Sequence, residues 1–485
     1  MLRDIQKKAL ELEKKGNLKD ALLLYLELVK QDSKNASHYN ASAVLFYKLQ
    51  QYKDAVRYFK EAIKHRPKYA EAYSNLGAVY AKFKSYTKAI ELYQKAIELK
   101  PSYAGSYTNL GNALNKSGEY EQAVYFHLRA IAIDPKSANH YANLGSAYKN
   151  LGRFDRAKAM YKKAIALEPK HINAHFDLST VLLQTDEYAE AWGEYEWRFA
   201  KDEMQGFILK YKEVFQTKRY SGQNLNGERV VVLGEQGFGD SIMMARYLYE
   251  LKSRGARVIV YQRSALLALF QNLPCVDEVL SRDEEPPNCE FYVCMMSLPL
   301  VLDKYLKNVN KNYPYIELKK SYELASKKIK IGIAWGGSNS GDSYKNKVFD
   351  LRHFRVMSQI KDIQLYSLQL GNDSAQIKEY GMQDNIIDLS ENINNFEDTA
   401  TIINNLDLVI SSDTSVVHLA GAMGKKTWCL LQKVPDWRWG VDACQSKWYP
   451  SAKIFKQHSL GDFNSVFKQV YAELYKEFKI EVKDV

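Results

Sequence analysis

The chain has 485 residues, and at roughly one domain per 150 residues this length predicts about three domains. Its composition, 46% hydrophobic and 26% charged, is that of a globular protein and excludes a disordered or fibrous chain. The net charge of +11 favours anionic ligands such as phosphates, but acidic and basic residues are interspersed and no nucleic-acid-binding motif occurs. The first residues form a charged amphipathic pattern and not a signal peptide, and no apolar run reaches the roughly 18 residues that span a bilayer. We therefore expect a cytoplasmic protein without a membrane span or a nucleic-acid partner.

The first 200 residues contain an internal repeat. One phrase returns as "YSNLGAVYAKFKSYTKAIELYQKAIELKP", "YTNLGNALNKSGEYEQAVYFHLRAIAIDP" and "YANLGSAYKNLGRFDRAKAMYKKAIALEP". The prolines that close the copies lie 34 residues apart, at Pro67, Pro101, Pro135 and Pro169. This period is typical of the tetratricopeptide repeat, which forms two antiparallel helices per copy. Weaker copies on both sides extend the prediction to five or six repeats over residues 1–200.

Asparagines occupy one position of the three strong repeats, at Asn75, Asn109 and Asn143. This position normally faces the concave groove of such an array. Because a carboxamide both donates and accepts hydrogen bonds, a ladder of them suits the backbone of an extended peptide. Asparagine can equally be the usual residue of this position without binding anything, and Ala41 and Asp177 interrupt the row.

From residue 228 the helical repeat gives way to short apolar runs separated by helical stretches. This alternation predicts buried parallel strands and a pair of Rossmann-like domains. The pattern predicts four segments after the repeats. They are a linker over 201–227, a first Rossmann-like domain over 228–318, a second one over 327–457, and a C-terminal helix over 458–485 that packs back across both domains.

The motif "LGEQGFGDS" follows the first of these strands. It lacks the ending of a phosphate-binding P-loop and the spacing of a dinucleotide-binding loop. Asp240 lies at the start of the next helix, where a carboxylate can cap the helix or take a proton from an incoming hydroxyl. The residues alone leave both roles open.

The motif "LDLVISSDTSVVHLAGAMG" predicts a second site. Asp413 is the expected N-cap of the helix that follows the strand, and the amides of Thr414, Ser415 and Val416 lie in its first turn, where a helix attracts phosphate. His418 lies one turn further on the same face, either facing the ligand or as a buried histidine bonded within the core.

Two further stretches lie near the predicted cleft. The loop "AWGGSNSGDSYKNKVFD" carries Lys345 and Lys347, which would stabilise a phosphate leaving group without a metal, or else form a solvated surface loop. Asp398 lies at the start of a predicted helix and suits a cap.

The order of these motifs, together with "SLQLG", "FEDTATIINNLD" and "VPDWRWG", resembles the bacterial tetratricopeptide-containing glycosyltransferases, over nearly the whole chain. Their catalytic half is similar to heptosyltransferases and has a GT-B fold. The resemblance implies an enzyme that inverts configuration and transfers sugar from a nucleotide-sugar donor, without a metal or other cofactor. Some members modify flagellin with nonulosonic acids. The layout is also similar to eukaryotic O-GlcNAc transferase, whose catalytic motifs differ.

The resemblance also assigns roles to individual residues. Asp240 matches the proposed general base, and the segment Asp413–His418 matches the diphosphate motif. Trp335 and Gln369 match strand ends that line the donor cleft. Where the family often has Arg-Ser, this chain has Lys347 and valine, and lysine keeps the charge but loses the two-pronged contact.

The expected function is therefore O-glycosylation of Ser or Thr on a protein held by the repeats. A lipid or polysaccharide acceptor, with the repeats used for homo-oligomer assembly, is an alternative. A non-catalytic binding scaffold is another.

Overall fold

The computed structural model describes residues 2–480 apart from 319, 321, 338–348 and 442–443. Contacts within the chain divide it into two compact units, Met1–Asp177 and Leu178–Val485. In the described residues no helix is both long enough and apolar enough to cross a membrane.

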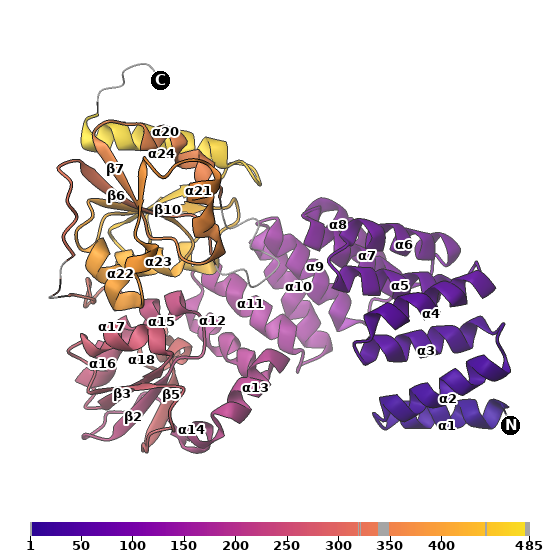
Figure 1. The fold of residues 1–485 in the computed structure, drawn as a ribbon. Coiled ribbons are helices and arrows are strands. Elements are labelled where there is room, and N and C mark those ends of the chain that lie inside the picture. The colour runs from indigo at the N-terminus through magenta and orange to yellow at the C-terminus, as the bar shows by residue number, and fades with distance from the viewer. Residues whose placement is uncertain (1, 319, 321, 338–348, 442–443, 481–485) are drawn as a thin grey trace. The chain divides into compact units, whose positions relative to one another are not determined.

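The first unit consists of helices that pack in consecutive pairs (Figure 1). Their bounds are α1 (Leu2–Lys14), α2 (Leu18–Gln31), α3 (Ala36–Lys48), α4 (Tyr52–His65), α5 (Ala70–Lys82), α6 (Tyr86–Leu99), α7 (Ala104–Ser117), α8 (Tyr120–Ile133), α9 (Ala138–Asn150) and α10 (Phe154–Leu167). The helix α11 (Ile172–Gln184) runs across the boundary, and α12 (Tyr188–Tyr195) lies in the second unit. The compact helical unit thus ends before residue 200, the boundary expected from the repeats.

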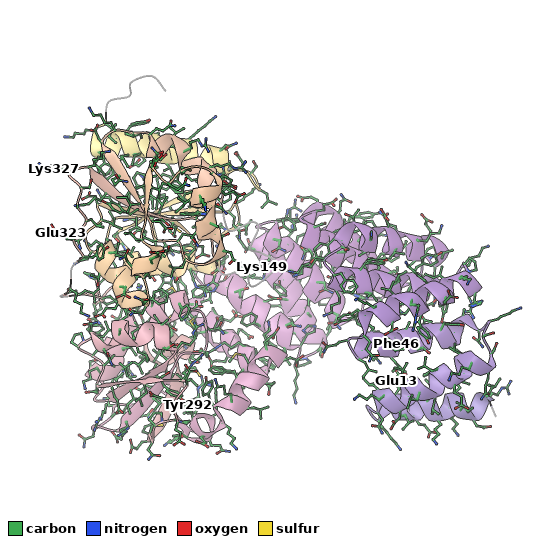
Figure 2. The ribbon with its side chains drawn as sticks, viewed as in Figure 1. Glu13, Phe46, Lys149, Tyr292, Glu323 and Lys327 are labelled. Carbon is green, nitrogen blue, oxygen red and sulfur yellow. The ribbon has the colours of Figure 1, made fainter. Side chains whose placement is uncertain are left out.

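Close packing within each repeat depends on a glycine that faces an aromatic ring. The pairs are Gly77 with Tyr93, Gly111 with His127, and Gly145 with Tyr161. A Cβ atom on Gly111 would lie 2.6 Å from Cε1 of His127, so only glycine lets the two helices approach this closely. Near the N-terminus, Phe46 joins the apolar core formed by the first helices (Figure 2).

The second unit contains two sheets in which all paired strands are parallel. The first has the order β1-β5-β2-β3-β4, with bounds β1 (Lys218–Arg219), β2 (Arg229–Leu233), β3 (Arg257–Gln262), β4 (Glu278–Ser281) and β5 (Phe291–Cys294). The second has the order β11-β10-β9-β6-β7-β8, with bounds β6 (Ile329–Ala334), β7 (Ile363–Ser367), β8 (Ile386–Asp388), β9 (Leu408–Ser412), β10 (Thr427–Leu431) and β11 (Ala452–Lys456). The predicted α/β character of this region is confirmed, although the periodicity did not reveal β1, β4 and β11.

Helices connect and cover these strands. They include α15 (Phe238–Met244), α16 (Arg246–Ser253), α17 (Leu267–Gln271), α18 (Leu298–Leu302), α20 (Arg355–Ser358), α21 (Gln376–Glu379), α22 (Phe396–Ile403) and α23 (Ser415–Ala422).

The predicted linker 201–227 is instead part of the first α/β domain. It contains α13 (Asp202–Lys210), α14 (Lys212–Gln216) and the edge strand β1. Tyr211 and Val214 are buried against residues of β2 and β3, including Val231 and Ile259. A polar, irregular stretch in the sequence therefore contributes apolar side chains to a core.

The C-terminal helix α24 (Phe463–Phe478) packs on the second sheet and not, as expected, across both domains. Its apolar face, which includes Phe467 and Val470, joins a core cluster with Ile331, Leu365 and other residues of that sheet. Every member of this cluster belongs to residues 329–480.

Candidate functional site

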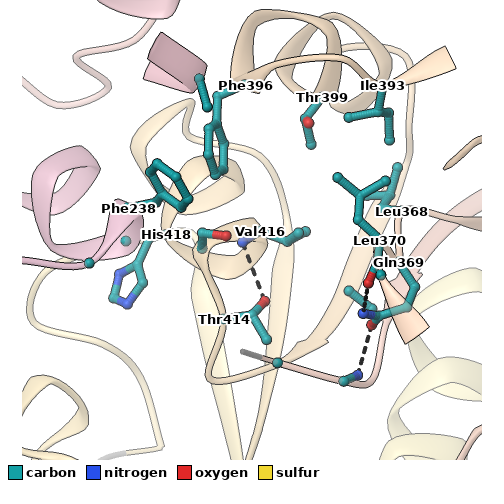
Figure 3. Close-up of a pocket in the computed structure, with 18 of the residues that line it drawn as sticks. Phe238, Leu368, Gln369, Leu370, Ile393, Phe396, Thr399, Thr414, Val416 and His418 are labelled. Carbon is teal, nitrogen blue, oxygen red and sulfur yellow. Dashed lines mark hydrogen bonds between the residues drawn. The ribbon is translucent and has the colours of Figure 1, made fainter. Parts of the chain in front are cut away.

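A cavity of about 790 Å³ lies where the carboxyl ends of strands from both sheets meet (Figure 3). Parallel α/β sheets characteristically bind ligands at this edge, because loops there are free of strand pairing. The walls come from the start of α15, the loops after β3, β6, β7 and β9, the starts of α22 and α23, and one arginine, Arg438. Phe238 from the first domain faces Phe396 from the second, with ring centroids 5.0 Å apart.

The turn after β2, within the motif "LGEQGFGDS", is held by three arginines. Arg198 forms an ion pair with Glu235, 2.9 Å from Nη2 to Oε1. Arg263 donates to the carbonyl of Gln236 at 2.8 Å, and Arg282 donates to the carbonyl of Gly234. Burial raises the pKa of Glu235, although Arg198 opposes this shift. These contacts set the turn, and therefore the place of Asp240, independently of any ligand.

Both oxygens of Asp240 have partners. Oδ2 accepts a hydrogen bond from the backbone N–H of Gly237 at 3.0 Å, so the predicted cap of the helix start is present. Oδ1 accepts from Nε of Arg438 at 3.0 Å and also from its Nη2. Asp240 lines the cavity as well. The geometry therefore combines the capping contact with a position from which the carboxylate can meet a ligand.

The second motif begins its helix one residue later than expected. The N-cap of α23 is Thr414, whose Oγ1 accepts from the N–H of Val416 at 3.3 Å, and not Asp413 (Figure 3). The N–H of Thr414 donates to the carbonyl of Ser412 at 2.7 Å. Two of the three amides expected to receive phosphate are thus already engaged within the chain. Asp413, Thr414 and Ser415 all line the cavity.

His418 lies at the boundary between the two domains. Its Nδ1 is 2.9 Å from the hydroxyl of Tyr449, and its Nε2 is 3.7 Å from Oδ1 of Asp413. A Cβ atom on Gly239 would lie 2.6 Å from Cδ2 of His418, so glycine at 239 allows α15 to approach α23. The His418 ring is mostly buried and also borders the cavity. It therefore has features of both predicted alternatives, a ligand-facing histidine and a histidine bonded within the core.

Of the two predicted donor-cleft residues Gln369 and Trp335, only Gln369 lines the cavity. Oε1 of Gln369 accepts from the N–H groups of Trp335 at 3.1 Å and Gly336 at 2.7 Å, which clamps the ends of β6 and β7 together at the cavity wall (Figure 3). The side chain of Trp335, by contrast, is fully buried in the core of the second sheet and does not line the cavity. The prediction that it lines the donor cleft is corrected, because the side chain packs in the core cluster with Ile331 and Ile333 of β6.

Lys345 and Lys347 lie outside the described residues. The described residues that line the cavity carry three carboxylates, Asp240, Asp373 and Asp413, and a single basic side chain of lysine or arginine, Arg438. An anionic ligand would therefore need positive charge in addition to Arg438. Within the described part of the chain, no group of three or more His, Cys, Asp or Glu residues could hold a metal ion.

Sequence reasoning missed the short segment Asp436–Gly440, here called the strap, as part of the site. Arg438 contacts Asp240, while the Trp439 ring stacks on His418 with centroids 5.3 Å apart. The signal available in the sequence was the density of tryptophan and arginine in "VPDWRWG", but no spacing rule connects it to the other motifs.

The three asparagines of the repeats lie half-buried on the first helices of their pairs, on α5, α7 and α9. Nδ2 of Asn75 donates to Oδ1 of Asn40 on α3 at 3.2 Å. The ladder therefore begins one residue out of register, with Asn40 in place of the alanine at position 41.

Comparison with known families supports the prediction that the helical unit consists of tetratricopeptide repeats. Tetratricopeptide repeat models match residues 40–104, 92–125, 111–152 and 138–171. The N-terminal region is thus a tetratricopeptide array, a class of fold that suggests protein–protein interaction.

Individual relatives are distant. Protein FlbA of Caulobacter vibrioides is 22% identical over 331 residues, which cover 61% of this chain and 54% of that protein. The chain thus spans about half the length of this curated relative. A thermophilic tetratricopeptide protein of Thermus thermophilus is 21% identical, with 38% of this chain and all of that chain covered at a TM-score of 0.35. The protein MamA is 28% identical, with 33% and 94% covered at a TM-score of 0.30.

Proposed function

We propose that the chain is an inverting glycosyltransferase of the GT-B type, which moves a sugar from a nucleotide-sugar donor to a hydroxyl of a protein. The observation that carries this proposal is the cavity of about 790 Å³ shared by two parallel sheets. Asp240 lies on its wall in the first domain, and Thr414 and Ser415 lie on its wall in the second. An acid–base group and a helix N-terminus then face one space, as transfer from a phosphate leaving group requires.

In the proposed reaction, Asp240 takes the proton of the acceptor hydroxyl while the oxygen of that hydroxyl attacks the anomeric carbon of the donor sugar. The bond from that carbon to the phosphate oxygen breaks on the opposite face, which inverts the configuration. The nucleotide leaves with the bonding electron pair. Thr414 and Ser415 would contact its phosphate, and Lys345 and Lys347 would neutralise the charge that develops there.

The proposed acceptor is a protein segment bound by the tetratricopeptide array. The half-buried amides of Asn75, Asn109 and Asn143 recur on successive helix pairs and suit the backbone of an extended segment. Flagellin is the acceptor favoured by the family resemblance, with a nonulosonic acid as one candidate sugar.

Two measurements test the proposal. Calorimetric titration of the full chain with CMP, UDP, GDP and ADP should find one nucleotide that binds, and Thr414→Ala and His418→Ala should weaken it. The intact mass of flagellin, incubated with the protein and the matching nucleotide sugar, should rise by one or more sugar residues. A wild-type protein that binds none of the four nucleotides would contradict the transferase proposal.

One observation favours a non-catalytic scaffold as the second candidate. The carboxylate of Asp240 is already paired with Arg438, as a purely structural aspartate would be. A scaffold would hold a partner protein through the repeats and leave the mass of that partner unchanged in the same incubation.

A further inference from the structure

The strap connects three parts of the second unit that are distant in sequence. Trp437 packs edge-on against Trp192 of α12, with ring centroids 5.8 Å apart, and against Trp448 at 6.0 Å. Trp439 donates from Nε1 to Oδ1 of Asp413 at 2.9 Å. Between the two tryptophans, Arg438 extends to Asp240 in the other α/β domain. Aromatic packing on both sides therefore fixes where the guanidinium lies.

The contacts of Arg438 are directional. Nε and Nη2 both donate to Oδ1 of Asp240, while Nη1 donates to Oδ1 of Asp436, and the guanidinium lies 4.4 Å from the centre of the Trp437 ring. Because Oδ2 of Asp240 accepts from the N–H of Gly237, the carboxylate is held from two sides and cannot rotate freely. Both side chains of the pair are only 14% exposed, so water screens the contact weakly.

We infer that Arg438 is a positioning residue for Asp240, which holds that carboxylate in place at the cavity wall during the proposed transfer. This inference rests on the proposed function. The physical reason is that a base acts only when its oxygen meets the acceptor proton, and a displacement of about 1 Å can cost roughly 10²-fold in rate. Arg438 acts through Asp240 and need not touch the sugar or the phosphate.

The test compares Arg438→Gln, Arg438→Lys and Asp240→Asn with the double variant Asp240→Asn/Arg438→Gln. In Arg438→Gln we expect kcat to fall roughly 10²-fold while KM for the donor changes by less than about threefold. Arg438→Lys should retain part of the lost kcat, because it keeps the charge but not both contacts. In the Asp240→Asn background, Arg438→Gln should lower kcat by less than about threefold further, since residues that act together are not additive.

Arg229→Gln is the matched control. Arg229 pairs with Glu278 at 3.5 Å and lies at the start of β2, at the opposite end of the strand from the cavity. Its loss should leave kcat and KM near the wild-type values. Thermal unfolding of each variant establishes that it is folded. If Arg438→Gln does not fold, Arg438→Lys replaces it in the test.

The outcomes separate this inference from the function on which it rests. Two results would overturn the positioning role and indicate a phosphate contact. One is that Arg438→Gln lowers kcat as much in the Asp240→Asn background as in the wild type. The other is a large rise in KM for the donor while kcat is unchanged. If the wild-type protein is active and Arg438→Gln has the same kcat, the positioning role is also overturned, but the proposed function is not. A wild-type protein without nucleotide binding or transfer would instead refute the proposed function.

Discussion

The indole nitrogen of Trp439 donates a hydrogen bond to the carboxylate of Asp413, 2.9 Å away and 26 residues earlier in the chain. The preceding residue, Arg438, reaches Asp240 across 198 residues. Two consecutive side chains of the strap therefore contact the two acidic residues that the sequence places in separate motifs. The strap therefore joins the two halves of the cavity.

Replacement of Asp240 by asparagine should lower transfer by roughly 10²- to 10⁴-fold, because the amide cannot accept the acceptor proton. Nucleotide affinity, measured by calorimetry, should change little. Asp398→Asn is the matched control, since Oδ2 of Asp398 accepts from the N–H of Asn395 at 3.2 Å and caps α22 in the same way. Turnover of Asp240→Asn within a few-fold of wild type would leave Asp240 with its capping role alone.

Loss of Lys345 and Lys347 should weaken nucleotide binding by at least about tenfold. The described lining of the cavity holds three carboxylates and one arginine, so a phosphate there depends on added positive charge. Affinities of the double alanine variant, measured at low and high salt, should also depend less on ionic strength than those of the wild type. The double variant Lys468→Ala/Lys476→Ala, at two exposed lysines of α24, is the charge-matched control. Unchanged affinity in the double variant would place the nucleotide elsewhere.

Replacement of Asn75, Asn109 and Asn143 by alanine should raise KM for the protein acceptor more than it lowers kcat. A backbone contact in the groove is present equally before and during transfer, so it contributes to binding and not to the chemical step. The control substitutes Lys95, Arg129 and Lys163, which recur one repeat apart and are exposed on the second helices of their pairs. Wild-type acceptor kinetics in the asparagine variant would exclude the ladder.

His127→Phe should make the helical unit more resistant to acid. His127 is fully buried, and neither ring nitrogen has a hydrogen-bond partner among the residues that the structure describes. The equivalent position two repeats earlier is Phe59. Burial, with a smaller effect from His140, lowers the pKa of His127 from 6.5 to about 3. Below about pH 6.5 the unfolded chain binds a proton that the folded chain does not. Stability present above that pH is therefore lost as the pH falls towards about 3.

This loss is at most about 1.4 kcal/mol per pH unit for a single group. Urea unfolding followed by circular dichroism, at about pH 7 and about pH 5, should show a smaller decrease for the phenylalanine variant than for the wild type. An equal decrease in the two proteins would mean that other groups control acid unfolding.

The sequence predicted the helical array well, since a 34-residue period is a local property that survives in every copy. It also predicted most buried strands, because runs such as "RVVVLG" need two covered faces. It failed where an element is short or carries mixed polarity. The strand β1 has two residues, both charged, and the segment around Tyr211 looks like a linker because its buried residues are separated by lysines and glutamates.

For the candidate site, the sequence by itself determined which residue types follow the strands: Asp240 after β2, the segment from Asp413 to His418 after β9, and Gln369 after β7. Parallel sheets bring such residues to one edge, so this much follows from chain order. Only the tertiary structure decided that Arg438 pairs with Asp240, that Thr414 and not Asp413 caps α23, and that the ring of Trp335 is buried. These outcomes depend on which long-range neighbours fill the space around each side chain, and a contact across 198 residues leaves no periodic trace in the sequence.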